Sequence, residues 1–261
     1  MSVSSSIYLD YGVHGTSIAI IHHPRRFLQY SRCYPLFSED TQFGIKASST
    51  PVYLVCVRMA EKRTFFFEGP ASITVEVDIQ TTVDADLTMQ YGHYTWRCAE
   101  ALAKYLSTHS SLVRGKHVLE LGSGTGLCGL VSALLGANHV TFTDADRSVE
   151  PNLLRNTEAN QVKNYTFHHL DWNDPCYKWK VVQFDVLLAA DCLFGKEVYE
   201  AFIRTASFLL HSRPDTFMLI SIEFREDFTE VWILFKKYLL QVERLEDTLV
   251  DNVQVYRITA K

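Results

Sequence analysis

The spacing of apolar residues along the chain changes at about residue 85. Before that point, the apolar residues from Ile73 to Ile79 alternate with polar ones, directly after a Glu-Gly-Pro-Ala turn. Alternation with a period of two is typical of strands with one buried face, so residues 63–79 predict a β-hairpin. Residues 1 to about 60 show little periodicity, and only residues 53–59 predict a buried strand.

Beyond residue 85, predicted strands and helices follow one another. Apolar residues three and four apart predict helices within 94–109, 127–135, 149–161, 197–210 and 228–239. Apolar runs predict strands at 117–121, 139–144, 165–170, 184–191 and 216–223, and two closing strands within 242–260. This order predicts an α/β fold with a doubly wound, seven-stranded Rossmann-like sheet and an antiparallel last strand. We therefore expect an N-terminal extension carrying the hairpin, residues 1–85, and an α/β domain, residues 86–261.

Composition and charge exclude several classes of function. Hydrophobic residues make up 47% and charged residues 21% of the chain, which is ordinary for a globular protein. The formal net charge is -5 and basic residues form no stripe, so we expect no nucleic-acid partner. No apolar run reaches about 18 residues and no signal peptide is recognisable, so we expect a cytoplasmic or nuclear protein without a membrane partner. The six cysteines form no C-x-x-C pair, so we expect no metal site. We also expect the protein to be a monomer.

Four glycines lie within the eight residues from Gly122 to Gly129, directly after the predicted strand 117–121. Doubly wound sheets bind ligands beyond the carboxyl ends of their strands, and this stretch lies at such an end. Gly122, Gly124 and Gly126 allow the backbone to turn sharply and to approach a ligand, and the helix that follows offers unpaired N–H groups. A plain turn needs fewer glycines, so we interpret this stretch as a ligand-binding loop.

Two cofactor classes compete for this loop. Residues 124–129 match the dinucleotide pattern G-x-G-x-x-G, but the match begins two residues past the glycine that ends the strand. The pattern acidic-x-Gly-x-Gly-x-Gly, with Glu120 at the strand end, fits better. A carboxylate there suits a cofactor that carries positive charge nearby, such as S-adenosylmethionine. The alternative is that Glu120 is structural and pairs with a backbone amide.

Acidic residues also follow the second and third strands of the α/β region. Asp144 ends the second strand and is placed to accept hydrogen bonds from ribose hydroxyls. Asp146 is the neighbouring candidate, and either residue could instead cap the next helix. After the third strand, Asp171 could accept a hydrogen bond from an adenine amine while Trp172 covers the adenine face. A polar turn with one packed tryptophan is the alternative.

The motifs VLELGSGTG, TFTD, LDW and DVLLAADCLF resemble, in this order, the seven-β-strand S-adenosylmethionine-dependent methyltransferases. The group that includes calmodulin-lysine methyltransferase has a D-x-x-[FY] motif after the fourth strand, and Asp191 to Phe194 match it. That group also has a tryptophan before the glycine motif, matched by Trp96 in QYGHYTWRCAEALAKYL, a segment especially similar to the methyltransferase-like 23 branch. The resemblance covers about residues 63–261. Arg97 departs from it, because the family often has W-P-x-A at this place.

The resemblance implies that S-adenosylmethionine is the cofactor and that a protein side-chain nitrogen, lysine rather than arginine, receives the methyl group. Asp191 would meet the incoming amine and Phe194 its alkyl stem, unless Phe194 is an ordinary core aromatic. Glu223 beside Asp191 keeps arginine open. The candidate cofactor-binding residues are Trp96, Glu120, Gly122, Gly124, Gly126, Asp144, Asp171, Trp172 and Ala190. An oxidoreductase using a nicotinamide cofactor, a small-molecule methyltransferase and a non-catalytic scaffold are the alternative functions.

Overall fold

The computed structural model divides the chain by its contacts into two units. The smaller unit comprises Met1–Met59 and Thr82–Thr88, and the larger comprises Ala60–Thr81 and Met89–Lys261. The residues that the structure describes are 7–11, 17–22, 52–55, 59–67, 73–81, 91–174, 183–224, 228–245, 248 and 252–261.

The smaller unit contains a three-stranded antiparallel sheet. Its strands are β1 (Ile7–Tyr11), β2 (Ser17–His22) and β3 (Val52–Val55), in the order β1-β2-β3. The predicted strand at 53–59 corresponds in part to β3, whereas the sequence analysis did not predict β1 and β2. Residues 56–58 of that prediction lie outside the described residues.

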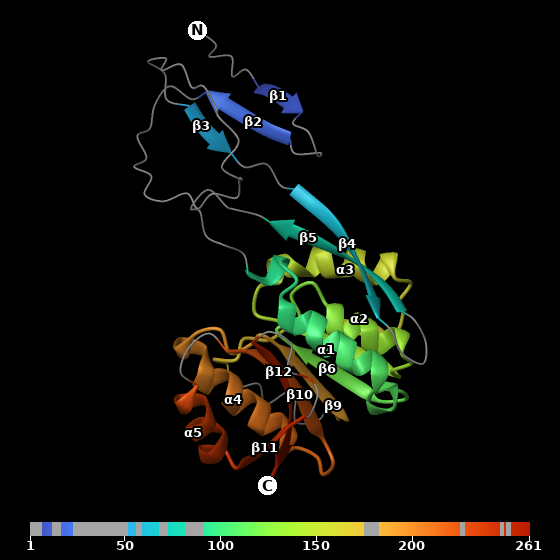
Figure 1. The fold of residues 1–261 in the computed structure, drawn as a ribbon, viewed down its shortest axis with the longest axis vertical. Helices are drawn as coiled ribbons and strands as arrows, with labels where there is room; N and C mark the ends of the chain where they lie inside the picture. Colours follow the sequence, from blue (N-terminus) through green and yellow to red (C-terminus); the bar gives the residue numbers. More distant parts are fainter. Residues whose placement is uncertain are drawn as a thin grey trace. The chain divides into compact units, whose positions relative to one another are not determined.

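The larger unit is built on the predicted seven-stranded sheet (Figure 1). Its strands follow one another in space as β11-β12-β10-β9-β6-β7-β8. All neighbours from β10 to β8 are parallel, and β12 runs antiparallel to both β10 and β11, which confirms the predicted antiparallel last strand. The bounds are β6 (His117–Leu121), β7 (His139–Asp144), β8 (Tyr165–His169), β9 (Val186–Ala190), β10 (Phe217–Glu223), β11 (Leu240–Arg244) and β12 (Val253–Ala260).

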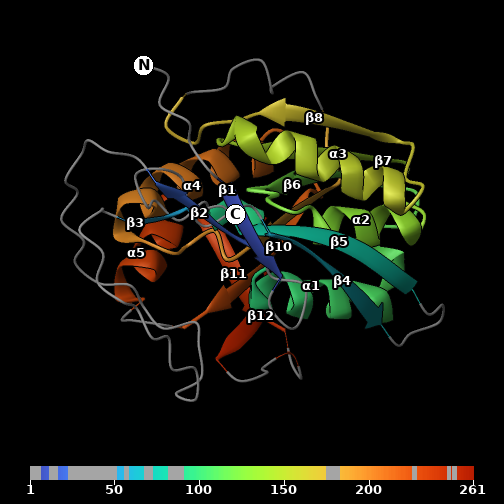
Figure 2. The ribbon, with the colours of Figure 1, turned by 90° about the horizontal axis from the view of Figure 1, so that it is seen from above.

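Helices cover both faces of this sheet (Figures 1 and 2). Successive residues of a strand point to opposite faces, so Leu188 of β9 packs with the core under α1, α2 and α3, whereas Leu187 packs with the core under α4 and α5. Both leucines are fully buried, and each such burial is worth about 1.5–3 kcal/mol. The helix bounds are α1 (Arg97–Thr108), α2 (Leu127–Leu134), α3 (Glu150–Ala159), α4 (Lys196–Leu210) and α5 (Thr229–Lys237). Among the described helices, none is long and apolar enough to cross a membrane.

The predicted hairpin is present as the two-stranded sheet of β4 (Met59–Phe67) and β5 (Ile73–Thr81). Phe65, Phe67 and Val77 are buried and join the core that underlies α1, α2 and α3. Arg63 of β4 also forms a 2.9 Å ion pair with Glu100 of α1. The sequence analysis placed this hairpin in the extension 1–85, but its contacts group it with the larger unit, because its apolar face completes the main core.

Candidate active site

The glycine loop, residues 122–126, follows β6 and contains three residues with a left-handed backbone. Gly122, Gly124 and Gly126 have φ angles of 61°, 51° and 84°, a region that residues with a Cβ rarely adopt. A Cβ on Gly122 would lie 3.1 Å from Cys192 Sγ and 3.2 Å from the ring of Trp172. The loop therefore needs glycine at the first position both for its conformation and for the closeness of these two neighbours.

The other two glycines meet different neighbours. A Cβ on Gly124 would lie 2.8 Å from the carbonyl oxygen of Gly92, so the loop lies against the backbone of the segment before α1. A Cβ on Gly126 would lie 2.7 Å from Leu153 Cδ1 of α3. Gly126 is therefore also required for packing between α2 and α3, a role that the glycine spacing alone does not reveal.

Glu120 is buried and holds the first turn of α2. Its Oε2 accepts a 3.1 Å hydrogen bond from the N–H of Gly129, and only 3% of the residue is exposed. This contact is the structural role that the sequence analysis left open for Glu120. Burial, opposed in part by this hydrogen bond, raises the pKa of the Glu120 carboxyl to about 8.

We expect Glu120→Gln to remove a pH dependence of stability. A carboxyl whose pKa is raised from 4.5 to about 8 on folding contributes stability below pH 4.5, and loses it as the pH rises through 8. At roughly 1.4 kcal/mol per pKa unit, the wild type should lose a few kcal/mol over this range relative to the variant. Glutamine keeps an oxygen for Gly129. Urea unfolding at pH 5, 6.5 and 8 measures the difference, and parallel curves for both proteins would contradict the prediction.

Asp144, at the end of β7, braces the glycine loop. Its Oδ2 accepts a 2.9 Å hydrogen bond from the N–H of Gly124, and its Oδ1 accepts one of 2.9 Å from Asp146. Asp146 in turn caps the 3₁₀ turn Arg147–Val149, because its Oδ1 accepts from the N–H of Ser148. Asp146 is thus the capping residue, and Asp144 lies at the loop. Burial raises the pKa of Asp144 despite its backbone donors.

A short 3₁₀ turn that the sequence did not predict, Tyr91–His93, lies against the glycine loop. Gly92 approaches the backbone of Gly124, and the buried His93 ring shares a 2.9 Å hydrogen bond with the Ser148 hydroxyl. The indole N–H of Trp96, the residue that caps α1, donates a 3.0 Å hydrogen bond to the carbonyl oxygen of Tyr91. The motif around Trp96 was therefore a usable signal, but the contacts of the turn before it were not visible in the sequence.

Asp191 and Phe194 follow β9 and its last residue, the half-buried Ala190. Asp191 is a non-glycine residue with a left-handed backbone, φ 57°, and is only 9% exposed. Its N–H donates a 3.1 Å hydrogen bond to the carbonyl oxygen of Ser221 in β10. Phe194 is 49% exposed, and its ring stacks on Tyr91 with the ring centroids 6.1 Å apart. The structure therefore favours an exposed aromatic over the alternative of a core residue.

Asp171 and Trp172 form a turn after β8. The Oδ1 of Asp171 accepts a 2.8 Å hydrogen bond from the N–H of Asn173. The Trp172 ring packs edge-to-face on Phe202 of α4, with centroids 5.0 Å apart, while its other neighbour is Gly122. The tryptophan is thus packed on α4 and also borders the glycine loop.

Glu223 ends β10 two residues beyond Ser221, which pairs with Ala190. The strand alternation places Glu223 on the same face of the sheet as Ser221, whose hydroxyl donates to the carbonyl oxygen of Cys98 at the start of α1. Glu223 is half-buried. Asp191 and Glu223 therefore lie at the ends of neighbouring strands. Among the described residues, no group of three side chains could hold a metal ion.

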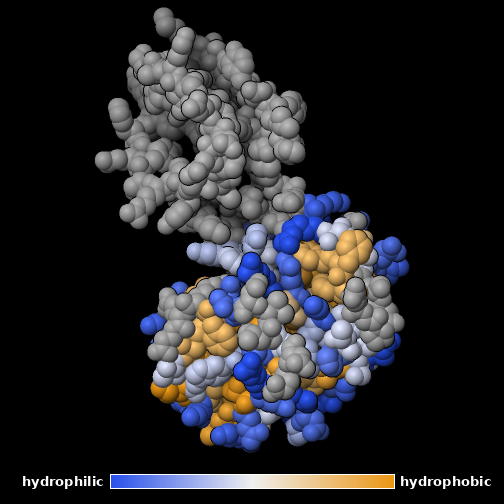
Figure 3. All heavy atoms as spheres, viewed as in Figure 1, coloured by the Kyte–Doolittle hydropathy of each residue, from blue (hydrophilic) through white to orange (hydrophobic). Residues whose placement is uncertain are grey.

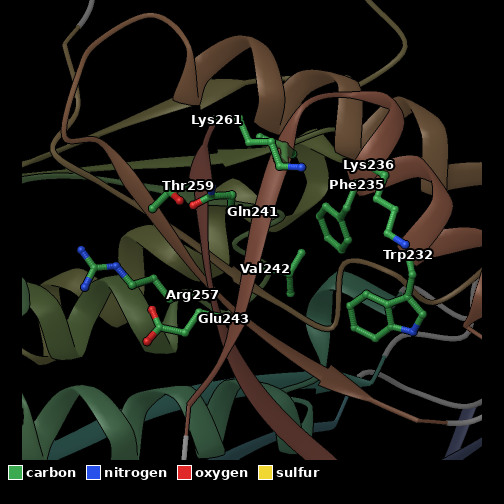
Figure 4. Close-up of a pocket in the computed structure, with 10 residues that line it drawn as sticks. Trp232, Phe235, Lys236, Gln241, Val242, Glu243, Arg257, Thr259 and Lys261 are labelled. Carbon is green, nitrogen blue, oxygen red and sulfur yellow. The ribbon is translucent and has the colours of Figure 1, made fainter.

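A separate pocket lies at the sheet edge formed by α5, β11 and β12 (Figure 4). Trp232 and Phe235 of α5 line it together with Val242, Arg257 and Lys261. Because Gln241 pairs with Thr259 and Thr259 with Phe217, the pocket lies beside the amino end of β10. It is therefore at the opposite end of the sheet from the glycine loop, and we assign it no part in the candidate active site.

Comparison with known proteins agrees with this fold and sequence pattern. A family model described as lysine methyltransferase matches residues 77–237. Protein N-lysine methyltransferase METTL21A of Danio rerio is 31% identical, over 62% of this chain and 74% of its own. Calmodulin-lysine N-methyltransferase of Arabidopsis thaliana is 32% identical, over 62% of this chain and 58% of its own length. Histone-arginine methyltransferase METTL23 of Rattus norvegicus is 31% identical, over 60% of this chain and 71% of its own length.

Solved structures show the same fold at low sequence identity. A Streptococcus mutans protein assigned as an S-adenosylmethionine-dependent methyltransferase superposes with a TM-score of 0.56 at 16% identity, covering 79% of this chain and 58% of its own. A second protein assigned as a methyltransferase, solved with S-adenosylhomocysteine, superposes with a TM-score of 0.54 at 15% identity. The match covers 75% of this chain and 55% of that protein. The expected doubly wound methyltransferase fold is therefore confirmed.

The residues at the carboxyl ends of β6, β7 and β9 fit S-adenosylmethionine. Gly122 lacks the Cβ that would crowd Cys192 Sγ and the Trp172 ring, so its backbone can lie directly beside Trp172. Each oxygen of Asp144 accepts one backbone hydrogen bond and keeps a lone pair for a ribose hydroxyl. The chain belongs to the lysine methyltransferase family and is an S-adenosylmethionine-dependent methyltransferase.

Proposed function

We propose that this enzyme transfers a methyl group from S-adenosylmethionine to the side-chain nitrogen of a lysine in a protein acceptor. One observation carries the proposal. A nearly buried carboxyl, Asp191, and a half-exposed aromatic ring, Phe194, leave the end of β9 together, next to the glycine loop. A carboxyl can meet an amine, and a ring beside it can pack on the alkyl stem of the same side chain.

The cofactor, when bound, supplies a methyl group that its sulfonium already activates, so this chain has to position the nucleophile and handle its proton. Free lysine has a pKa of about 10.4, and the reactive neutral amine is scarce at neutral pH. A carboxylate that only attracted the ammonium would hold the unreactive form. Asp191 must therefore orient the amine and pass its proton to water.

Arginine is the second candidate acceptor, and one observation favours it. Glu223 ends β10 next to the strand that leads to Asp191, and two carboxylates can grip a guanidinium through paired hydrogen bonds. The names of the relatives divide in the same way, since METTL21A and the calmodulin enzyme are named for lysine and METTL23 for histone arginine. We favour lysine because the family model is described as lysine methyltransferase.

Tritiated-methyl labelling tests the proposal. The purified protein and tritiated S-adenosylmethionine are added to a cell extract whose own cofactor has been removed, and labelled bands are analysed by mass spectrometry. We expect labelled protein bands whose peptides carry methylated lysine, and no labelling with the Asp191→Asn variant. Methylation of arginine only would support the second candidate, and label in small molecules without any labelled protein would contradict the proposal.

A further inference from the structure

Four aromatic side chains form a continuous row beside the end of β9. Tyr94 packs edge-to-face on Trp96 at 5.0 Å between centroids, Trp96 lies 6.1 Å from Tyr91, and Tyr91 stacks on Phe194 at 6.1 Å. Trp96 is half-buried, whereas Tyr94, Tyr91 and Phe194 are 41%, 56% and 49% exposed. The row therefore contains three partly exposed rings and ends at Phe194, three residues after Asp191.

Exposure by itself would mean little, because single exposed apolar residues are common on protein surfaces. The face drawn in Figure 3 shows hydrophobic residues interspersed with hydrophilic ones. Phe66 of β4 is 78% exposed, yet among the described residues no ring packs on it. The aromatic row differs because its rings contact one another, and its last member, Phe194, lies three residues after Asp191.

The row is also fixed in place from both ends. Tyr91 and Phe194 lie on segments about a hundred residues apart in sequence. The hydrogen bond from the indole of Trp96 holds the carbonyl of Tyr91, and the hydrogen bond from Asp191 to Ser221 holds the start of the segment that carries Phe194. An exposed pair of rings with such anchors costs little conformational entropy when it binds a ligand.

We propose that Tyr91 is a specificity residue for the acceptor, and that the stacked Tyr91–Phe194 pair binds the alkylammonium group of the acceptor lysine. This inference rests on the proposed function and adds to it a residue that the D-x-x-F motif does not contain. Aromatic ring faces attract cations, and they do so for methylated as well as for unmodified ammonium groups. Asp191, the residue that we expect to orient the amine, lies three residues before Phe194 on the same segment.

The chemistry of the acceptor explains why such a surface is useful. At neutral pH a lysine side chain arrives protonated, since its pKa is about 10.4. The ring pair can hold this cation and its alkyl stem without a second salt bridge, so that Asp191 remains able to orient the amine once the proton has left. Each methyl transfer also leaves a cation, which the same rings can bind.

The test uses the full-length protein with saturating S-adenosylhomocysteine and two small probes. One probe is Nα-acetyl-Nε-trimethyl-lysine amide, and the other is its neutral isostere, in which a carbon replaces the charged nitrogen. Binding is followed by NMR line broadening and chemical shifts of the probes. We expect the wild type to prefer the cationic probe by about two- to fivefold, the range expected for an exposed cation–π contact.

The variants assign this preference to the ring pair. Tyr91→Phe keeps the ring and should keep the preference, whereas Tyr91→Leu should abolish it. Phe194→Leu removes the other ring and tests the same pair if Tyr91→Leu does not fold. Phe66→Leu is the matched control and should behave as the wild type, because Phe66 is exposed and packs on no other ring of the described residues. Equal binding of both probes to the wild type, or an undiminished preference in both leucine variants, would overturn the inference.

Two further outcomes separate this inference from the proposed function. If extract labelling yields methyl-lysine but Tyr91 changes nothing in the probe assay, the inference fails and the proposed function stands. If no protein is labelled but the cationic preference depends on Tyr91, the ring pair is a cation site and the proposed function fails. A methylguanidinium probe that binds more tightly than the trimethylammonium probe would also overturn the assignment to lysine.

Discussion

Asp191→Asn should reduce the single-turnover rate of methyl transfer by about 10²–10⁴-fold, the range expected for loss of a proton-handling group. The amide has the shape of the carboxyl but cannot accept the proton that the amine must lose. Affinity for S-adenosylmethionine should stay within a few-fold, because the backbone hydrogen bond from residue 191 to Ser221 does not involve the side chain. The rate is measured with the acceptor found by extract labelling, at saturating cofactor.

The substitution is also gentle on the fold. Asp191 has a left-handed backbone, and asparagine is among the few residues that tolerate this conformation. Asp215 offers a matched control, since it is left-handed as well, with φ 70°, but lies exposed before the amino end of β10. Asp215→Asn should leave the rate unchanged. A wild-type rate for Asp191→Asn would remove Asp191 from the mechanism and make Glu223 the next residue to test.

Much of the sheet could be predicted because its signals are local. Most strands of the larger sheet are short apolar runs, and each helix repeats apolar residues at helical spacing, so the order of elements follows from the sequence. The glycine loop was predictable for the same reason, since three alternate glycines after a strand have few other uses. Their left-handed φ angles show that all three positions favour glycine.

The remaining features depend on contacts between distant segments. Nothing near Gly124 in the sequence indicates that Gly92 lies against it, because 32 positions separate them. A backbone amide was one of the two expected partners of Glu120, but the sequence could not identify it as the N–H of Gly129, since one sequence does not show which way a side chain turns. The hairpin of β4 and β5 was predicted as an element, yet its grouping with the main core follows from side chains such as Phe65.

Gly124→Val should abolish binding of S-adenosylmethionine. The residue has φ 51°, a genuine outlier for a β-branched side chain, and its Cβ would lie 2.8 Å from the carbonyl oxygen of Gly92. Relief of this clash moves either the Tyr91–His93 turn or the loop itself. A moved loop breaks the hydrogen bond from the Gly124 N–H to Asp144. Either movement displaces one side of the region where we expect the cofactor.

Thermal and urea unfolding with and without S-adenosylmethionine measure the loss. At a ligand concentration of about 100 times the dissociation constant, the wild type should gain ~2.7 kcal/mol and the variant nothing. Gly115→Val is the matched control, because Gly115 is also left-handed, with φ 70°, but has open space around its Cβ position. That variant should lose some stability from backbone strain and yet keep the full ligand gain. If Gly124→Val folds and retains the gain while Gly115→Val behaves in the same way, the glycine loop does not bind the cofactor.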